Sequence, residues 1–347
     1  MSRGDDRDGA GHRRYGRHMG GPAVLAALPP LSPSTVITQA AVDPVAALLT
    51  VTAALLYVGG VRRLARRGRH WSSMRSLSFG IGIAMLLVAT QSGVAAYDTV
   101  LFSAHVVQHV LLGVVAPLFL ALGAPVTLAL QASRRHTQVN LLRLIRSRPA
   151  RLVAHPIVAF ALFSLSLFVL YFSGLYERSL QNGVVHAWTH IHFVVVGSLF
   201  FWVTIGLDPV AHRIPYGARL LIVALTVPFH AFLGLALLST AEPIAAAWYA
   251  TAADRPPGID LLADQHAGAT VMWLVGDLIG LVAGGIVAIQ WFRHEQRQTR
   301  RLDRELDALE VRDAREAAAD ALDRDTTMRA HEPAATRESR AGDRTAR

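Results

Sequence analysis

Seven long apolar stretches, separated by short polar segments, constrain the fold of this 347-residue chain more than any other feature. A helix needs about 20 predominantly apolar residues to cross the hydrocarbon core of a bilayer. The stretches lie at residues 44–61, 76–97, 101–122, 155–173, 186–206, 218–240 and 266–291. We therefore expect an all-α polytopic membrane protein, a bundle of seven transmembrane helices. Pro117 and the segment Gly123-Ala124-Pro125 predict a kink or a break in the third stretch.

Charge and glycine content divide the chain into four parts. Residues 1–42 are rich in glycine, proline and charge, which predicts a disordered N-terminal extension. Residues 43–292 form the seven-helix membrane domain. Residues 293–322 combine leucines with opposite charges three and four positions apart, which favours a charged helix in the cytoplasm. Residues 323–347 are expected to be a disordered tail.

The basic residues are unevenly placed, and this placement predicts the topology. Fourteen arginines lie in the loops around residues 62–75, 132–154 and 207–219, whereas only Arg178 and Arg255 lie in the alternate loops. Cytoplasmic loops of membrane proteins carry the excess of basic residues. We therefore expect the N-terminus outside and the C-terminus in the cytoplasm. The formal net charge of +9 is then a topology signal and does not indicate a nucleic-acid partner.

Several classes of chemistry are excluded by what the sequence lacks. Without cysteine there is no disulfide, no thiolate metal site and no thiol catalysis. The sequence has no phosphate-binding glycine-rich loop and no nucleophile elbow. We therefore do not expect an enzyme.

Histidines within the apolar stretches are the main candidates for a functional site. Two His-x-x-x-His pairs begin the third and fifth stretches, and this spacing places both rings of a pair on one helix face. A single histidine at a helix end is usually an interfacial polar residue, but several at membrane depth on one side indicate a site. The candidate metal ligands are His105, His109, His186, His190, His230 and His266.

Two acidic residues accompany these histidines. Asp264 precedes His266 by two residues, and Asp277 lies near the membrane centre, where His230 is its candidate partner. Imidazole ligands suit copper, zinc, iron and nickel, so spacing alone does not identify the metal. Haem with histidine axial ligands is the rival cofactor.

Four segments resemble the CtaG family of cytochrome c oxidase assembly proteins. They are SAHVVQHVLLGVVAPLFLALGAPVTLAL at 103–130, LYERSLQNGVVHAWTH at 175–190, VPFHAFLGLALL at 227–238 and DQHAGATVMWLVGDL at 264–278. The resemblance implies that His105, His109, His186, His190 and His230 are ligands and that Asp264 and Asp277 are the accompanying acids. His266 stands where family members often have glutamine, which makes it the weakest candidate.

The resemblance implies a multi-pass protein of the bacterial plasma membrane that helps to assemble a haem–copper cytochrome c oxidase. It would bind a copper ion on the outer side and deliver it to oxidase subunits, with copper chaperones as further partners. A copper transporter or copper-tolerance protein is the alternative, and a haem b electron carrier or a structural scaffold are others. The sequence does not predict an oligomeric state.

Overall fold

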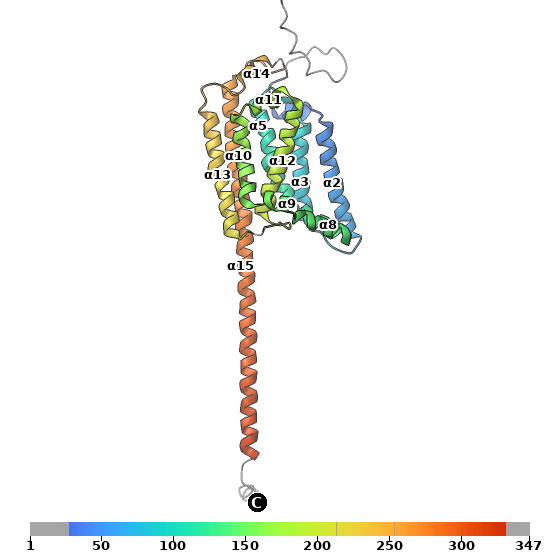
Figure 1. Ribbon diagram of the computed structural model, residues 1–347, viewed down its shortest axis with the longest axis vertical. Helices are drawn as coiled ribbons and strands as arrows, with labels where there is room; N and C mark the ends of the chain where they lie inside the picture. The colour runs from blue at the N-terminus through green and yellow to red at the C-terminus, as the bar shows by residue number, and fades with distance from the viewer. Residues whose placement is uncertain (1–27, 213, 253, 331–347) are drawn as a thin grey trace, which may run out of the picture. The chain divides into compact units, whose positions relative to one another are not determined.

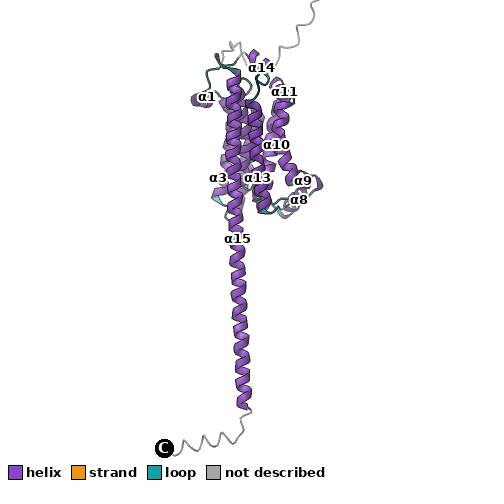
Figure 2. Cartoon of the chain, turned by 90° about the vertical axis from the view of Figure 1, so that its left-hand side faces the viewer, coloured by secondary structure: helices purple, strands orange, loops and turns teal. Residues whose placement is uncertain are grey.

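The chain is helical throughout the part that the structure describes. The computed structural model describes residues 28–212, 214–252 and 254–330, and these contain helices and loops but no strand (Figures 1 and 2). The helices are α1 Pro33–Thr38, α2 Pro44–Ala65, α3 Ser73–Gln91, α4 Gly93–Tyr97, α5 Phe102–Val110, η1 Leu111–Val115, α6 Ala116–Leu122, α7 Pro125–Ala132, α8 Arg135–Ile145, α9 Arg148–Val153, α10 Pro156–Phe172, α11 Leu175–Gln181, α12 Gly183–Ile205, α13 Tyr216–Leu238, α14 Ala246–Thr251 and α15 Leu261–Ala330. The all-α class is confirmed.

Six helical segments of the described chain are long and apolar enough to cross a membrane, in agreement with the polytopic prediction. They are Pro44–Ala65, Ser73–Tyr97, Phe102–Leu122, Gly183–Ile205, Tyr216–Leu238 and Leu261–Met328. Helices α10 and α11 bend by 72° relative to each other and make a seventh span if they are counted together. The count is thus six or seven, against the seven that we expected.

The third apolar stretch is interrupted, as its prolines predict. Helix α5 passes into η1, a π-helical turn, directly before Pro117. This wider turn accommodates a proline, which has no backbone N–H and crowds the carbonyl four residues earlier. After α6, Ala124 adopts the left-handed conformation at φ 49° and the chain turns into α7. The span Phe102–Leu122, which carries His105 and His109, therefore ends at the tight turn around Ala124.

Helix α12 lies very close to η1 because both carry glycine at the contact. A Cβ atom built at Gly197 would overlap the carbonyl oxygen of Gly113 and would also meet the ring of Pro117. Gly113 itself packs on the ring of Phe193. Small residues let helix backbones approach closely in membranes, where packing rather than the hydrophobic effect drives association. This contact holds the helices with the two histidine pairs side by side.

A hydrogen-bonded aromatic cluster attaches α2 to the bundle. The Tyr57 hydroxyl donates to the carbonyl of Gly123 at 2.9 Å, and the Trp71 indole donates to that hydroxyl at 3.0 Å. The rings of Tyr57 and Phe79 stack with centroids 3.8 Å apart. Because the polar atoms of both aromatic side chains are paired, the cluster is buried without cost from unsatisfied groups.

A second compact unit begins at Val287. Its described residues, 287–330, belong to α15, and this helix includes the predicted charged segment. The pairs Arg301–Glu305 and Arg312–Glu316 lie four residues apart with N–O distances of 3.6 and 3.3 Å. Exposed pairs of this kind contribute only a few tenths of a kcal/mol each, about 0.3–0.5.

The described residues reach into both segments that we expected to be disordered. Helix α1 lies within residues 1–42, and residues 323–330 continue α15. The Tyr97 hydroxyl donates to the carbonyl of Pro29 at 2.7 Å, which ties the residues before α1 to α4. Residues 1–27 and 331–347 lie outside the described part.

Replacing Gly197 by alanine is expected to destabilise the bundle. The added methyl group must push α12 away from η1, and overpacking of this kind costs about 1–3 kcal/mol. A lower midpoint of thermal unfolding in detergent would show the effect. Gly59→Ala is the matched control, because nothing lies within 4 Å of a Cβ at that position. Equal midpoints for the two variants would contradict the importance of the contact.

Candidate metal centre

The start of α5 is fixed by a carboxylate from another helix. Helix α5 has no cap from its own N-cap residue, Leu101. Instead, Asp264 of α15 accepts hydrogen bonds from the backbone N–H of Phe102 at 2.7 Å and from both the backbone N–H and the hydroxyl of Ser103. An anion at a helix N-terminus satisfies free N–H groups and complements the helix dipole. Asp264 is therefore a positioning residue for the histidines that follow.

Four histidines form one compact cluster between α5 and α12, which we call the histidine cluster. Its members are His105, His109, His186 and His190. Ring centroids within each pair lie 4.1 Å apart on α5 and 4.2 Å apart on α12. Across the two helices the centroids lie 5.4 Å apart for His105 and His186 and 5.7 Å apart for His109 and His190. The two rings of each i, i+4 pair lie on one helix face, as predicted. In addition, the two pairs face each other, so that the four rings form one cluster.

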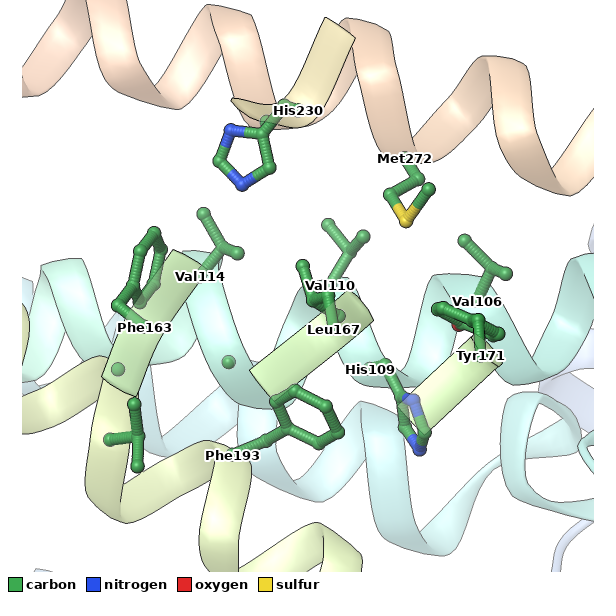
Figure 3. A pocket seen from close by; sticks show the side chains of 14 residues that line it. Val106, His109, Val110, Val114, Phe163, Leu167, Tyr171, Phe193, His230 and Met272 are labelled. Atoms are coloured by element: carbon green, nitrogen blue, oxygen red, sulfur yellow. The ribbon is translucent and has the colours of Figure 1, made fainter. Parts of the chain in front are cut away.

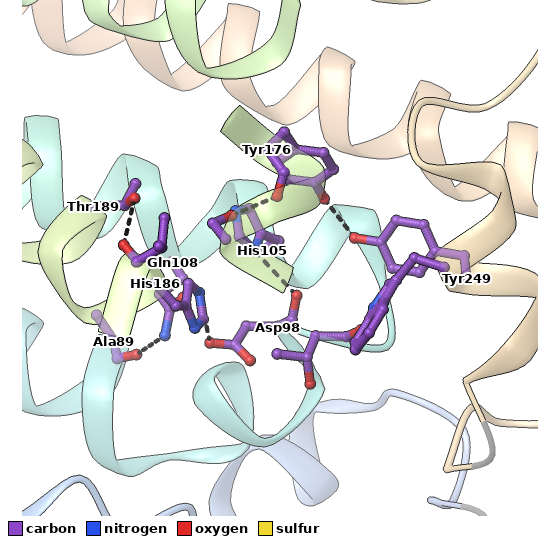
Figure 4. A network of polar contacts seen from close by, with 12 residues as sticks. Ala89, Asp98, His105, Gln108, Tyr176, His186, Thr189 and Tyr249 are labelled. Carbon is purple, nitrogen blue, oxygen red and sulfur yellow. Dashed lines mark hydrogen bonds and ion pairs between the residues drawn. The ribbon is translucent and has the colours of Figure 1, made fainter. Parts of the chain in front are cut away.

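The ring nitrogens of this cluster have few protein partners. His105 Nδ1 lies 3.1 Å from the carbonyl oxygen of Asp98 (Figure 4). A carbonyl only accepts, so Nδ1 carries the proton and Nε2 keeps its lone pair. Buried nitrogens without a hydrogen-bond partner are Nε2 of His105, His186 and His190 and both ring nitrogens of His109. Buried polar atoms are nearly always paired, so these nitrogens are the atoms of the described chain that could bind a metal ion.

Asp98 joins the histidine cluster, although the sequence did not single it out as a ligand. It lies in the turn between α4 and α5 and is 5% exposed, and its Oδ2 lies 3.6 Å from Nε2 of His186. Burial raises the pKa of this carboxyl to about 7. Its position on the same side of the membrane as the histidines, in the turn seven residues before His105, is the sequence signal that could have found it.

Two overlapping sets of three residues offer ligand atoms at metal-binding separations. The donor atoms of His105, His109 and His186 lie within 4.8 Å of one another, and so do those of Asp98, His186 and His190. His186 belongs to both sets.

Polar contacts around the cluster hold its walls in place. Gln108 donates to the carbonyl of Ala89 at 2.9 Å and thereby joins α5 to α3. The ring of Tyr176 packs edge-on against His105 with centroids 4.8 Å apart, and its hydroxyl bonds that of Tyr249 at 2.5 Å (Figure 4). Trp248 donates to the carbonyl of Thr99 at 2.8 Å, beside Asp98. Helices α3, α11 and α14 thus fix the turn and the rings.

His230 and His266 lie outside these two sets of donors. His230 of α13 is 5% exposed and its Nδ1 has no partner, and Phe163 packs edge-on against its ring. His266 is partly buried at the start of α15, and its Nε2 also has no partner. Among the described residues, neither belongs to a group of three potential ligands within 4.8 Å.

Asp277 does not pair with His230 in the described chain. Its Oδ2 accepts a hydrogen bond from Trp273 Nε1 at 2.8 Å, one turn earlier on α15, and its Oδ1 is buried without a partner. The expected Asp277–His230 pair is therefore replaced by a contact within one helix. Depth along a helix predicted both residues to lie near the membrane centre, but depth does not fix which way a side chain points.

The histidine cluster borders a large groove on the α2 side. The groove has a volume of about 950 Å³, and its lining includes Thr50, Thr90 and His190 among mostly apolar side chains of α2, α3, α7 and α12. His190 therefore lines both the cluster and the groove. The cluster is closed by protein toward α11 and α14 but borders this space toward α2.

Comparison with known proteins places the sequence of this chain in a family. A family model described as "Cytochrome c oxidase caa3 assembly factor" matches residues 55–294. The chain is 35% identical over 265 residues to the uncharacterized protein Mb0105 of Mycobacterium bovis and to the uncharacterized protein MT0111 of Mycobacterium tuberculosis, covering 74% of this chain. It is 33% identical over 271 residues to the uncharacterized protein ML1998 of Mycobacterium leprae, covering 75% of this chain.

These relatives are longer than the matched region. The match covers 40% of the length of the M. bovis and M. tuberculosis proteins and 41% of the M. leprae protein. The chain therefore spans about two fifths of the curated relatives it matches. No solved structure matches this chain.

Removal of the Asp264 carboxylate is expected to lower stability and to weaken metal binding together. Asp264→Ala leaves the first N–H groups of α5 unpaired, at a cost of about 0.5–2 kcal/mol. Asp208→Ala is the matched control, because Asp208 accepts the same kind of bond from Val126 and Thr127 at the start of α7. Thermal unfolding should report a loss in both variants, whereas copper titration should change only for Asp264→Ala. Equal copper binding in both would show that Asp264 does not position the cluster.

The stability of the metal-free protein is expected to depend on pH through Asp98. The folded state keeps this carboxyl neutral up to about pH 7, whereas the unfolded chain ionises it near its usual pKa of 3.8. Between about pH 4 and pH 7 the carboxyl is therefore ionised in the unfolded chain but neutral in the folded chain. The free energy of unfolding falls over this range by about 1.4 kcal/mol per pH unit.

Asp98→Asn keeps a neutral side chain at every pH and tests this expectation. Its thermal midpoint should exceed that of the metal-free wild type at pH 8 and approach it at pH 4. Asp260→Asn, at an exposed position, controls for loss of a carboxylate. A difference between Asp98→Asn and wild type that stays constant over this pH range would show that Asp98 is not held neutral.

Proposed function

Because this chain belongs to the family of cytochrome c oxidase caa3 assembly factors, we propose that it helps to assemble a haem–copper cytochrome c oxidase by holding copper at the histidine cluster and delivering it to the oxidase. The observation that carries this proposal is the convergence of four imidazoles, two of them buried and two partly buried, each of which has at least one buried ring nitrogen without a protein partner. A neutral imidazole with a free lone pair is a good copper ligand.

The donor set supports a site that both binds and releases copper. His105 donates its Nδ1 proton to a backbone carbonyl, a contact that fixes the tautomer and ring orientation of metal-binding histidines. Asp98 would supply a negative charge beside His186 and partly neutralise the ion. His186 lies in both sets of potential ligands, so an ion can change partners without leaving the cluster.

The proposal places the histidine cluster on the outer side of the bacterial plasma membrane. The arginine-rich loops lie at the opposite end of the bundle from the turn that contains Asp98, around α8 and α9 (Figure 1). The positive-inside rule assigns these loops to the cytoplasm. Copper would then enter from outside, where copper chaperones and the copper-containing oxidase subunits are the proposed partners. No catalytic step is part of this role.

Removal of cluster ligands is expected to abolish copper binding and to reduce oxidase activity. The double variant His105→Gln, His186→Gln leaves polar groups in place but removes one ligand from each helix. Copper binding should be lost, a larger effect than the loss of about 10- to 100-fold in affinity that removing an outer-shell partner causes, as measured by elemental analysis and by competition with a copper chelator. His192→Gln is the matched control, because His192 of the same helix bonds Ser166 at 2.8 Å and does not belong to the cluster.

The same variants distinguish the competing functions. Oxidase activity in a deletion strain should be restored by wild type and His192→Gln but not by the double variant, and added copper should restore it in part. Normal oxidase activity in the deletion strain would contradict the assembly role. Copper uptake into vesicles would instead indicate a transporter, and a Soret band in the purified protein would indicate haem.

A further inference from the structure

The groove beside α2 is polar at one end and mostly apolar along the rest of its length. At the end where α2 and α12 begin and α3 ends, its lining includes Asp43, Thr50, Thr90 and His190. We call these four residues the polar end. The other carboxylate in the lining, Asp208, lies at the opposite end, and both of its oxygens accept hydrogen bonds from backbone N–H groups of α7. The two carboxylates therefore have different surroundings.

Asp43 holds a carboxylate in a fixed position at the polar end. Its Oδ1 caps α2 by accepting hydrogen bonds from the backbone N–H groups of Val45 at 3.0 Å and Ala46 at 2.9 Å. The side chain of Gln91 bonds both the N–H and the carbonyl of Asp43, at 3.2 and 2.9 Å, which joins the start of α2 to the end of α3. Within the described chain, Oδ2 has no hydrogen-bond or ion-pair partner. This oxygen is therefore able to interact with a cation.

The polar end leads from Asp43 to the histidine cluster. Thr50 follows Asp43 by seven residues, so the two lie on one face of the helix, about 10 Å apart along its axis. Thr50 and His190 both line the groove, and each lies about two turns into its helix. His186 lies within the electrostatic range of the Asp43 carboxylate. Polar groups thus connect the start of α2 with two members of the cluster.

Burial increases from the groove into the histidine cluster. Among the cluster members, His190 is the one that lines the groove. His186 and His190 are partly buried, whereas His105 is 0% and His109 is 2% exposed. The set of potential ligands that contains His190 also contains Asp98 and His186. An ion that came through the groove would meet this set before the more deeply buried pair on α5.

The opposite side of the cluster offers no comparable polar path in the described chain. The space beyond His109, toward α13 and α15, is lined mainly by apolar side chains, with Val110, Val114, Leu167 and Phe193 among them (Figure 3). A charge in an apolar interior is costly unless it is paired. Protein also covers the cluster toward α11 and α14. The groove is therefore the side that suits the passage of an ion.

We propose that copper enters and leaves the histidine cluster through the polar end of the groove, with Asp43 as the residue that captures the ion before His190 binds it. The identity of the ion rests on the proposed function. A carboxylate beside the path attracts a cation over several ångströms and raises its association rate. The Thr50 hydroxyl offers an oxygen between Asp43 and His190. A common path for entry and exit makes the cluster a loading site and not part of a channel.

A single introduced thiol tests this path without copper, because the chain has no cysteine. Thr50→Cys places a thiol in the groove, and Thr52→Cys is the matched control on the exposed opposite face of α2. A membrane-impermeant trimethylammonium thiosulfonate should modify Thr50→Cys in the metal-free chain in lipid nanodiscs, because a hydrated thiol ionises and the thiolate reacts. Thr52→Cys, which faces hydrocarbon, should stay unmodified. Equal reaction at the two positions, or none at Thr50→Cys, would overturn the path.

Asp43→Asn in the Thr50→Cys background tests the capture of cations. Asparagine also caps helices well, so α2 keeps its start while the charge is lost. The reaction with the cationic reagent should slow by about fivefold, the effect of one unit charge near a hydrated path. A neutral hydroxyethyl thiosulfonate should react at an unchanged rate. Asp260→Asn is the control, and equal rates of the cationic reagent in the two variants would overturn the role of Asp43.

Stopped-flow measurement of copper binding connects the path to the cluster. Asp43→Asn should slow copper association by about fivefold and weaken its dependence on ionic strength, with little change in affinity. Thr50→Cys that carries the thiosulfonate adduct should bind and release copper more slowly than the unmodified variant. Unchanged association in the modified variant would show that copper reaches the cluster by another path.

The outcomes separate this inference from the proposed function. If the thiol reactions follow the expected pattern but wild type binds no copper, the proposed function is wrong, and the polar end remains a path for cations. If copper binds at the histidine cluster while Thr50→Cys is inert to the cationic reagent, the proposed function stands and the path is wrong.

Discussion

Helix α12 lies against η1 at a separation that only glycine at position 197 permits, and the arrangement of the two histidine pairs depends on this contact. The π-helical turn directly follows the helix that carries His105 and His109, and α12 carries His186 and His190. A wider separation at Gly113 and Gly197 would move the two histidine pairs apart. A steric constraint near the middle of the membrane thus sets the distances between four imidazoles nearer one end.

Unpaired polar atoms connect this packing to function. In a dry bundle interior, an imidazole nitrogen without a partner is costly unless another group satisfies it. The histidine cluster concentrates such atoms, whereas the aromatic cluster at Tyr57 and Trp71 pairs its polar groups within the protein. The two kinds of cluster therefore have different roles. The paired cluster stabilises the fold, and the unpaired nitrogens of the histidine cluster support the proposed metal site.

Four aspartates show that residue type and depth in the membrane are not enough to predict the role of a side chain. Asp264 and Asp208 both cap helix N-termini from a different part of the chain, Asp98 lies beside His186, and Asp277 bonds Trp273 on its own helix. All four look alike in a sequence as isolated acids in or near an apolar stretch. Their partners lie up to 162 residues away along the chain, so only the fold identifies them.

The sequence by itself determined the helical membrane class, the position of each apolar stretch, the break near Pro117 and the i, i+4 histidine pairs. These features follow from hydropathy, helix periodicity and proline geometry, which act over a few neighbouring residues. Only the tertiary structure decided that the pairs on α5 and α12 meet, that Asp98 joins them, and that His230 lies beside Met272 rather than paired with Asp277. These contacts depend on the rotation and spacing of whole helices, and close packing sets both.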